Sequence, residues 1–429
     1  MRTILTPAKS EWESLCRRPV MEKDNLNEIV TGIIKSVVYQ NDAALYSFSE
    51  RFDGVKLNDL KVTASEINNA SSLIPEELKN AINTAKENIE KFHSAQLKKE
   101  PVVETTSGVR CWRKSIPIEK VGLYIPGGTA PLFSTLLMLG IPARIAGCRE
   151  IIICSPPSKD GDINPIILYT ASIIGITDIF KVGGAQAIAA MANGTETIPK
   201  VYKIFGPGNQ YVTKAKELVQ LDGVSIDMPA GPSEVLVIAD KYANPAFVAA
   251  DLLSQAEHGT DSQVILLTDN QDIIDKVKKE TENQLQVLPR KEIAALSLEN
   301  SCIILLDSLE KCIDFSNLYA PEHLIINTQN PNLLAEKVIN AGSVFLGSFS
   351  CESAGDYASG TNHTLPTNGY ARNYSGVSTE SFMKKVTFQE ISREGIMNLG
   401  PAIELMAKAE LLEGHKNAVS IRLKSLKND

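Results

Sequence analysis

The chain has 429 residues, 43% of them hydrophobic and 22% charged, so it is long enough for more than one domain and its composition excludes a disordered or fibrous protein. A formal net charge of −8 argues against binding to nucleic acid, because phosphate binding requires clustered Lys and Arg. The seven cysteines form no CxxC pair, and no apolar run reaches the roughly 18 residues of a membrane span, so we expect a cytoplasmic enzyme with small-molecule partners, no nucleic acid and no membrane contact.

Residues 1–115 are predicted to be mainly helical, with amphipathic helices over 26–40 and 75–93. His93 ends the second of these helices. That position is more typical of a residue that complements the helix dipole than of a metal ligand. No motif in this part of the chain indicates chemistry.

From residue 120 onward, short apolar runs alternate with helical patterns. Strands are predicted at 120–126, 150–156, 178–184 and 203–208, with helices at 133–147, 163–175 and 185–194. The alternation resumes with strands at 235–240, 262–268, 301–307, 323–328 and 343–347, and with helices at 245–259, 271–286 and 331–342. Each series predicts an α/β domain with a mostly parallel sheet. Because the two series join at residues 227–235, we expect the site in the crevice between the domains.

A stretch rich in Gly, Ser, Thr and Asn follows at residues 348–376. Long irregular segments in compact proteins are usually functional or disordered, and the presence of Asp356 and His363 favours function here. Residues 378–429 return to helix on both sides of His415. Such a tail packs on its own body or reaches to a partner.

Two glycine-rich turns follow predicted strands. YIPGGTAP, at residues 124–131, opens a helix, where backbone N–H groups and the helix dipole can receive an anion. GPGNQY, which begins at Gly206, starts like a dinucleotide fingerprint but lacks its last glycine, and the sequence contains no Walker-type motif. The turns alone leave a nucleotide site and ordinary loop glycines equally open.

Two of the five histidines directly follow a glutamate. In SQAEHG, helical spacing puts Gln255 and His258 on one face while Glu257 points elsewhere, which fits either a metal-binding pair or a solvated helix end. In APEHL, Glu322 and His323 stand at the entry to a strand, where His323 is either a general base or a buried, hydrogen-bonded histidine.

Asp356, His363 and His415 have no diagnostic spacing. An Asp beside glycine is also typical of a turn, and His415 fits a position beyond a helix cap. The residue patterns therefore leave three interpretations open. They are a dehydrogenase with a metal or a base, a metal-dependent hydrolase of a small cationic substrate, and a non-catalytic small-molecule-binding protein.

Eight stretches together resemble the histidinol dehydrogenase family, in the order in which that family shows them. They are VGLYIPGGTAPLFSTLLML, VGGAQAIAAMANGTE, KIFGPGN, IDMPAGPSEVLVIAD, LLSQAEHGTDSQVILLT, APEHL, SAGDYASGTNHTLPT and GHKNAVSIR. The resemblance extends over nearly the whole chain. It implies zinc-dependent oxidation of L-histidinol to L-histidine through L-histidinal, the final step of histidine biosynthesis, with two successive hydride transfers to two NAD+.

The fold that the resemblance implies is α/β. It has two incomplete Rossmann-like domains with mostly parallel sheets, an N-terminal helical arm and a C-terminal helical tail. We expect the arm over residues 1–24, an NAD-binding domain over 124–233, and a discontinuous domain with the catalytic and metal residues over 25–123 and 234–377. The tail, residues 378–429, is expected to be exchanged within a homodimer.

The family's functional residues can be carried over position by position. Its zinc ligands, for one Zn2+ per subunit, fall on Gln255, His258, Asp356 and His415, a mixed nitrogen and oxygen set. Its NAD contacts fall on Tyr124, Gln186 and Asn209. Its substrate contacts fall on Ser233, Gln255, His258, His323, Asp356, His363, Glu410 and His415.

The resemblance also implies a division of labour at the site. His323 would accept the alcohol proton as hydride leaves, and would act as base again in the second oxidation. Glu322 would activate the water that adds to the aldehyde, while zinc orients the substrate. Glu410 and His415 would enter the active site of the partner subunit.

Overall fold

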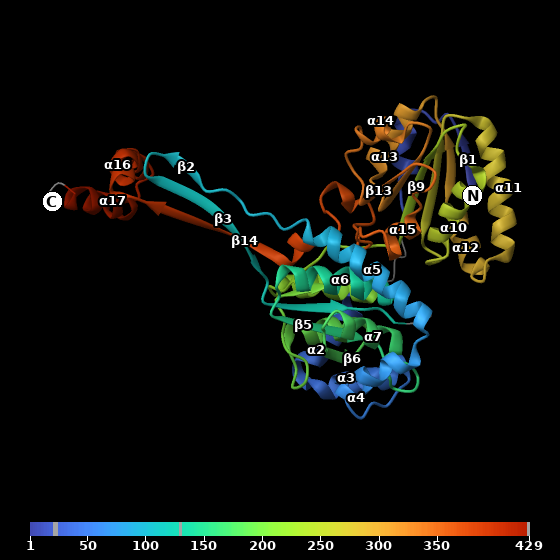
Figure 1. Cartoon of the computed structure of the whole chain (residues 1–429), viewed down its shortest axis with the longest axis horizontal. Coiled ribbons are helices and arrows are strands. Elements are labelled where there is room, and N and C mark those ends of the chain that lie inside the picture. The colour runs from blue at the N-terminus through green and yellow to red at the C-terminus, as the bar shows by residue number, and fades with distance from the viewer. Residues whose placement is uncertain (20–24, 128–130, 427–429) are drawn as a thin grey trace.

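A computed structural model describes residues 1–19, 25–127 and 131–426, which form two α/β lobes and a long projecting arm (Figure 1). The turn YIPGGTAP, for which the sequence left an anion site and an ordinary loop equally open, lies partly outside the described residues, which stop at Gly127 and resume at Pro131. None of the helices in the described part of the chain combines the length and apolar composition needed to cross a lipid bilayer.

The first lobe is built on a parallel sheet. Its five described strands follow the order β6-β5-β4-β7-β8. They are β4 (Lys120–Tyr124), β5 (Glu150–Ser155), β6 (Asp178–Lys181), β7 (Lys203–Phe205) and β8 (Ser225–Ile226). Alternate residues of one strand enter different cores, as Ile152 and Ile153 of β5 do. The sheet is therefore buried on both faces, which explains the unbroken apolar runs in its sequence.

Helices cover both faces of this sheet. One face carries α4 (Ala64–Ala70), α5 (Glu76–Ser94), α6 (Phe133–Ala146) and α7 (Pro165–Ile173). The other carries α2 (Leu26–Gln40), α3 (Asp42–Phe48), α8 (Gly184–Asn193) and α9 (Gln210–Leu221). This packing departs from the expected grouping of residues 25–123 with the second sheet, because the apolar faces of α2 and α5, with Val30 and Ile89 fully buried, cover the first sheet.

The second lobe is built on a parallel sheet in which six described strands follow the order β1-β11-β10-β9-β12-β13. They are β1 (Arg2–Leu5), β9 (Glu234–Ala239), β10 (Gln263–Thr268), β11 (Cys302–Leu305), β12 (His323–Asn327) and β13 (Ser343–Leu346). Helices α10 (Pro245–Ala256), α11 (Gln271–Val287) and α12 (Lys291–Glu299) pack on one face. Helices α1 (Trp12–Leu15), α13 (Leu309–Tyr319) and α14 (Pro331–Ala335) pack on the other, and α15 (Glu352–Tyr357) follows β13.

The N-terminal segment was expected to be a helical arm over residues 1–24, and its described part, residues 1–19, instead begins with a strand ahead of the short helix α1. Its first residues form β1, which pairs with β11, and Trp12 is buried with its ring edge-on to Phe315 at a centroid distance of 5.4 Å. The strand pairing and the apolar side chain of Trp12 anchor the described part of this segment to the second lobe.

The projecting arm joins two distant parts of the sequence. Strands β2 (Val103–Thr106), β3 (Val109–Pro117) and β14 (Met383–Ile391) form an antiparallel sheet in the order β14-β3-β2. Helices α16 (Arg393–Ala409) and α17 (Glu413–Ser425) pack against each other at its tip, far from both lobes in Figure 1. The tail was expected to be helical throughout, so β14 is a correction. Its ladder partners lie about 270 positions earlier, and local periodicity cannot reveal them.

The expected fold class is confirmed: two α/β lobes with mostly parallel sheets, ending in a helical tail. Each strand predicted between residues 120 and 347 is present, with ends that differ by a few residues. The helix predicted over 331–342 is shorter, because α14 ends at Ala335. The segment 348–376 contains α15 and a short 3-10 helix, Tyr370–Arg372, within otherwise irregular chain.

Trp12 should contribute strongly to the stability of the second lobe. We expect Trp12→Ala to lower the free energy of unfolding by about 3–5 kcal/mol, because it removes a large buried ring and leaves a cavity beside Phe315. Urea unfolding followed by circular dichroism measures this change. The exposed neighbour Glu13 provides the control, since Glu13→Ala should stay within about 0.5 kcal/mol of the unsubstituted protein. Equal stability of the two variants would contradict the anchoring of this segment.

Candidate active site

Glu322 and His323 lie side by side at the N-terminal end of β12, where that strand pairs with β9. Both side chains are buried. Glu322 Oε2 accepts a hydrogen bond of 2.8 Å from the backbone N–H of Glu234, and His323 Nδ1 lies 3.2 Å from the carbonyl oxygen of the same residue. One peptide segment at the start of β9 therefore holds both members of the Glu-His pair.

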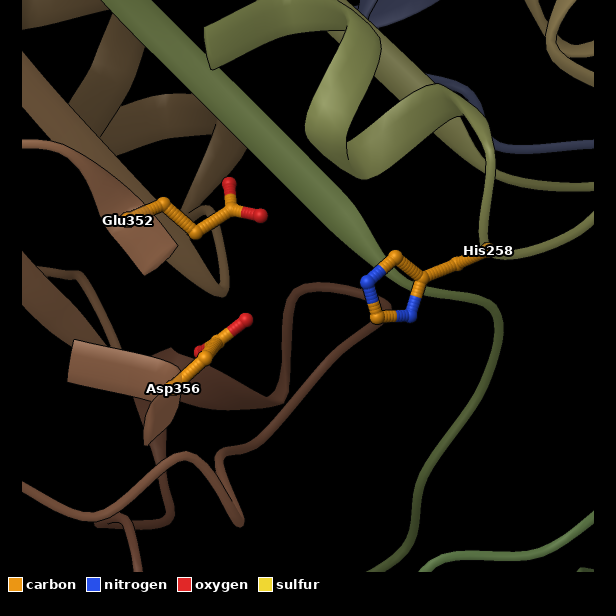
Figure 2. Close-up of side chains that lie close together, drawn as sticks. All are labelled: His258, Glu352 and Asp356. Atoms are coloured by element: carbon orange, nitrogen blue, oxygen red, sulfur yellow. The ribbon is translucent and has the colours of Figure 1, made fainter. Parts of the chain in front are cut away.

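A cluster of three potential metal ligands lies next to this pair. The imidazole of His258 and the carboxylates of Glu352 and Asp356 point toward one another (Figure 2), and their ligand atoms lie within 4.8 Å of each other. His258 follows the C-terminal end of α10, whereas Glu352 and Asp356 share one face of α15 at i,i+4 spacing. His323 Nε2 lies 3.4 Å from Asp356 Oδ1, which connects the Glu-His pair to the cluster.

Gln255 is buried one helical turn before His258 and contacts the same group of residues. In the amide orientation that satisfies both of its polar atoms, its nitrogen donates to Glu352 Oε2 at 3.0 Å and its oxygen accepts from Glu234 N–H at 3.2 Å. The structure thus brings Gln255, His258, Asp356 and the Glu322–His323 pair into one region.

Burial and neighbouring charges shift the proton affinities of these groups. Burial raises the pKa of Glu322 to about 8 and raises that of Glu352 well above its usual value. Burial alone would lower the pKa of His323, but the carboxylates of Glu322 and Asp356 outweigh it and raise that pKa to about 10. The site is therefore rich in buried carboxylates, which favour a positive charge among them.

Two further expected substrate contacts border the region. Ser233 directly precedes Glu234, and its carbonyl oxygen accepts from Gln263 N–H at 3.2 Å. His363 lies near enough for the charge of Asp356 to act on it, while burial lowers its pKa. Among the described residues, His363 Nε2, His323 Nε2 and Asp356 Oδ1 are buried without a hydrogen-bond partner of good geometry.

Glu410 and His415 do not join this cluster within one chain. Both are exposed, and both lie at the tip of the arm, Glu410 after α16 and His415 in α17. Figure 1 shows these helices at the far end of the molecule from α15. In a single chain, His258 is the exposed member of the cluster, whereas Glu352 is buried.

The expected NAD residues lie together in the first lobe. Tyr124, Gln186 and Asn209 line a cavity of about 1160 Å³, which α2 and the segment that follows α3 also border. Tyr124 ends β4, Gln186 lies in the first turn of α8, and Asn209 caps α9. The cavity therefore lies beyond the C-terminal ends of parallel strands, the edge at which open α/β sheets bind ligands.

Gly206 fixes the turn between β7 and α9 beside this cavity. Its φ of 129° is in a region that favours glycine, and a Cβ there would collide with the carbonyl oxygen of Tyr124. Its N–H donates to Asp227 at 2.8 Å and its carbonyl accepts from Lys216 Nζ at 2.9 Å, while Lys216 and Asp227 form a buried ion pair. Close packing therefore explains why position 206 of this turn requires glycine.

A family model described as histidinol dehydrogenase matches residues 16–423. The chain belongs to the histidinol dehydrogenase family. It is 60% identical over 427 residues to a histidinol dehydrogenase of Bacteroides thetaiotaomicron, with 100% of both chains covered. It is 53% identical over 426 residues to a histidinol dehydrogenase of Yersinia pestis, with 98% of this chain and 95% of the relative covered.

A solved relative agrees in fold as well as sequence. The crystal structure of histidinol dehydrogenase from Elizabethkingia anophelis superimposes with a TM-score of 0.98 at 60% identity, covering 100% of this chain and 99% of that one. Membership in the histidinol dehydrogenase family makes the chain an oxidoreductase. Of the three interpretations that the residue patterns left open, this favours the dehydrogenase over the hydrolase and the binding protein.

Sequence analysis missed two residues that the geometry brings to the site. Glu352 is one helical turn before Asp356 in ESAGD, so helical spacing around Asp356 would have pointed to it. Glu234 contacts the Glu-His pair through its backbone, and no side-chain pattern signals such a role.

Glu352 should matter for cation binding at this cluster. We expect Glu352→Gln to weaken Zn2+ binding by about 10- to 100-fold, because it removes a buried charge next to His258 and Asp356. Competition with a chromophoric chelator measures the affinity. Glu257→Gln removes an equal charge from the residue beside His258, on a side chain outside the cluster, and should leave the affinity near its original value. Equal affinities of the two variants would count against Glu352.

Proposed function

We propose that this chain oxidises L-histidinol to L-histidine through L-histidinal, using Zn2+ and passing two hydrides in succession to two NAD+, and so completes histidine biosynthesis. The observation that carries this proposal is the approach of His323 Nε2 to Asp356 Oδ1 at 3.4 Å. That approach joins a buried imidazole to a set of metal-binding side chains. The names of the relatives supply the substrate class.

The side chains at the cluster fit a zinc ion. We propose Gln255, His258 and Asp356 as ligands, together with His415 from a partner subunit, because imidazole nitrogen and carboxylate or amide oxygen are donors that Zn2+ accepts. Asp356 Oδ1 is a buried carboxylate oxygen without a hydrogen bond among the described residues, as a ligand atom would be. When bound, Zn2+ would orient the substrate and offset the carboxylate charges that raise the pKa of His323, which favours the neutral imidazole.

His323 acts as the general base in this scheme. Its Nδ1 faces the Glu234 carbonyl, so its Nε2, on the side of Asp356, is free to accept a proton. In the first oxidation, Nε2 takes the hydroxyl proton of histidinol while the carbinol hydride passes to NAD+, and the C–O bond becomes the carbonyl of the aldehyde. NAD+ supplies the electrophilic ring carbon that receives each hydride.

Glu322 prepares the second oxidation. Its carboxylate takes a proton from a water molecule as that water adds to the aldehyde, while His323 gives the proton that it took in the first oxidation to the aldehyde oxygen. The product is the hydrate, and His323 is again able to act as a base. His323 then removes a hydroxyl proton of the hydrate while the second hydride leaves to a second NAD+, which gives the carboxylic acid of histidine, and the acid loses its proton to solvent. A pKa near 8 for Glu322 matches a base that works close to neutral pH.

The cofactor and the rest of the substrate have separate binding regions. Tyr124, Gln186 and Asn209 hold NAD+ in the first-lobe cavity, where the N-termini of α8 and α9 favour the pyrophosphate. Ser233 and His363 contact the substrate from within the same chain. These contacts leave the cationic amino group of histidinol close to the carboxylates of the second lobe.

Glu410 and His415 complete the site from a second copy of the chain. The arm holds both residues away from its own lobes, so an intact site requires a homodimer in which arms are exchanged. Glu410 then contacts the substrate and His415 completes the zinc ligands.

The proposed reaction predicts a chelator-sensitive formation of NADH. With L-histidinol and excess NAD+, we expect two NADH per histidinol, loss of activity after a strong chelator, and recovery when Zn2+ is added back. Absorbance of NADH and chromatography of histidine measure the stoichiometry. Magnesium added in place of zinc serves as the control. Turnover that persists at full rate in metal-free protein would contradict the role of the metal.

Arm exchange predicts complementation between inactive variants. When His323→Asn and His415→Asn proteins are unfolded, mixed and refolded together, we expect about a quarter of the original activity, because random pairing makes half of the dimers heterodimers with one intact site each. NADH formation measures the recovery. Mixing His323→Asn with Glu322→Gln is the control, since both changes lie in the same lobe and no site is intact. No recovery in the first mixture would contradict exchange of the arms.

A further inference from the structure

We propose that Arg18 is a positioning residue for the Glu322–His323 pair, and that it acts through the side chain of Glu234 and the corner before β12 to hold His323 in the Nδ1–H tautomer. The inference rests on the proposed function, because it takes His323 as the base. Arg18 has no expected contact with substrate, cofactor or metal.

Arg18 forms a buried ion pair with Glu234. Its Nε donates to Oε1 at 2.8 Å and its Nη2 to Oε2 at 3.0 Å, and the two side chains are only 9% and 1% exposed. A paired guanidinium and carboxylate fix each other in direction as well as distance. The backbone N–H of Asn368 also donates to Glu234 Oε1, at 2.8 Å. The Glu234 side chain is therefore held from two sides.

The same guanidinium holds the chain that leads into the Glu-His pair. Arg18 Nη2 donates to the carbonyl oxygen of Tyr319 at 2.7 Å and lies 3.4 Å from that of Ala320, and its Cζ lies 3.8 Å from the centre of the Tyr319 ring. Ala320 has a φ of 55°, a left-handed conformation that is strained for a residue with a Cβ. Such a strained conformation persists when surrounding contacts impose it, and Arg18 provides such a contact. Ala320 lies only two residues before Glu322.

Glu234 transmits this constraint to both members of the pair. Its N–H donates to Glu322 Oε2, and its carbonyl oxygen faces His323 Nδ1. A carbonyl accepts but cannot donate, so His323 must carry its proton on Nδ1 to make this bond, and Nε2 is left with a lone pair. A shift of Glu234 would release the tautomer and the position of the Glu322 carboxylate together.

The test compares the kinetics of two Arg18 variants and one control variant in the zinc-loaded enzyme. We expect Arg18→Met to lower kcat by about 10- to 100-fold while KM for L-histidinol and zinc content change by less than about threefold, because base geometry rather than substrate binding is disturbed. Arg18→Lys should retain an intermediate kcat, since an ammonium keeps the charge but not the two-sided contact. The exposed neighbour gives the matched control: Arg17→Met should equal the original enzyme.

A double variant separates positioning from folding. Removal of one partner leaves a buried charge unpaired, so Arg18→Met alone can fold poorly. Arg18→Met with Glu234→Gln removes both charges, and it should recover thermal stability but not kcat. Recovery of kcat together with stability in the double variant would overturn the proposal, and so would an original kcat in Arg18→Met.

The tautomer gives a spectroscopic readout that a structural role would not move. In the zinc-loaded proteins, we expect nitrogen NMR of the imidazoles to show His323 protonated at Nδ1 alone in the original protein and a mixture of tautomers in the double variant. The chain has five histidines, and His323→Asn assigns the signal by its loss. An unchanged tautomer in the double variant would overturn the inference.

The activity of His323→Asn distinguishes a failure of the proposed function from a failure of the role of Arg18. If that variant kept its original kcat, the base assignment in the proposed function would fail, and this inference with it. If it lost turnover while Arg18→Met did not, this inference alone would fail.

Discussion

In a parallel α/β sheet, the N-terminal and C-terminal ends of the strands differ in their electrostatics. The two lobes of this protein place their candidate sites at opposite strand ends. In the first lobe, the cavity lies beyond the C-terminal end of β4, where α8 and α9 begin and their N-termini present partial positive charge. In the second lobe, Glu234 and His323 begin their strands, and α10 ends just before His258, so the partial negative charge of a helix C-terminus lies nearby. The C-terminal strand ends of the first lobe suit the anionic pyrophosphate of a dinucleotide. The N-terminal strand ends of the second lobe suit a metal ion and a cationic substrate.

In the second lobe, buried carboxylates lie near the partial negative charge at the C-terminus of α10. Burial raises the pKa of Glu322 to about 8 and that of Asp251 to about 7, and it raises that of Glu352 well above normal. Buried carboxylates without compensation are costly, and a protein lowers that cost by protonating them or by supplying a cation. Arg18 compensates Glu234. The remaining carboxylates repel one another, and the proposed zinc ion and cationic substrate would offset that repulsion.

The parts of this fold that the sequence predicted are those set by local patterns. Apart from the two-residue β8, which was not predicted, the strands from β4 to β13 are short apolar runs, and burial on both faces requires that composition. Gln255 and His258 share a region because helical spacing brings them together, and Glu322 and His323 because they are neighbours. Family resemblance, not spacing, assigned roles to these residues. Helical spacing also related Glu352 to Asp356, although the sequence analysis did not use it.

The parts that were missed depend on contacts between residues far apart in the chain. Arg18 bonds Glu234 across 216 positions and Tyr319 across 301, and β1, in the same N-terminal segment, pairs with β11. No pattern within the first twenty residues signals such contacts, because their partners supply the geometry. These long-range contacts also determine how the candidate site is held in place. The corner that carries Glu322 and His323 is complete only when the N-terminal segment has docked, so Trp12 and β1, which contact neither residue of the pair, secure the position of the guanidinium that holds it.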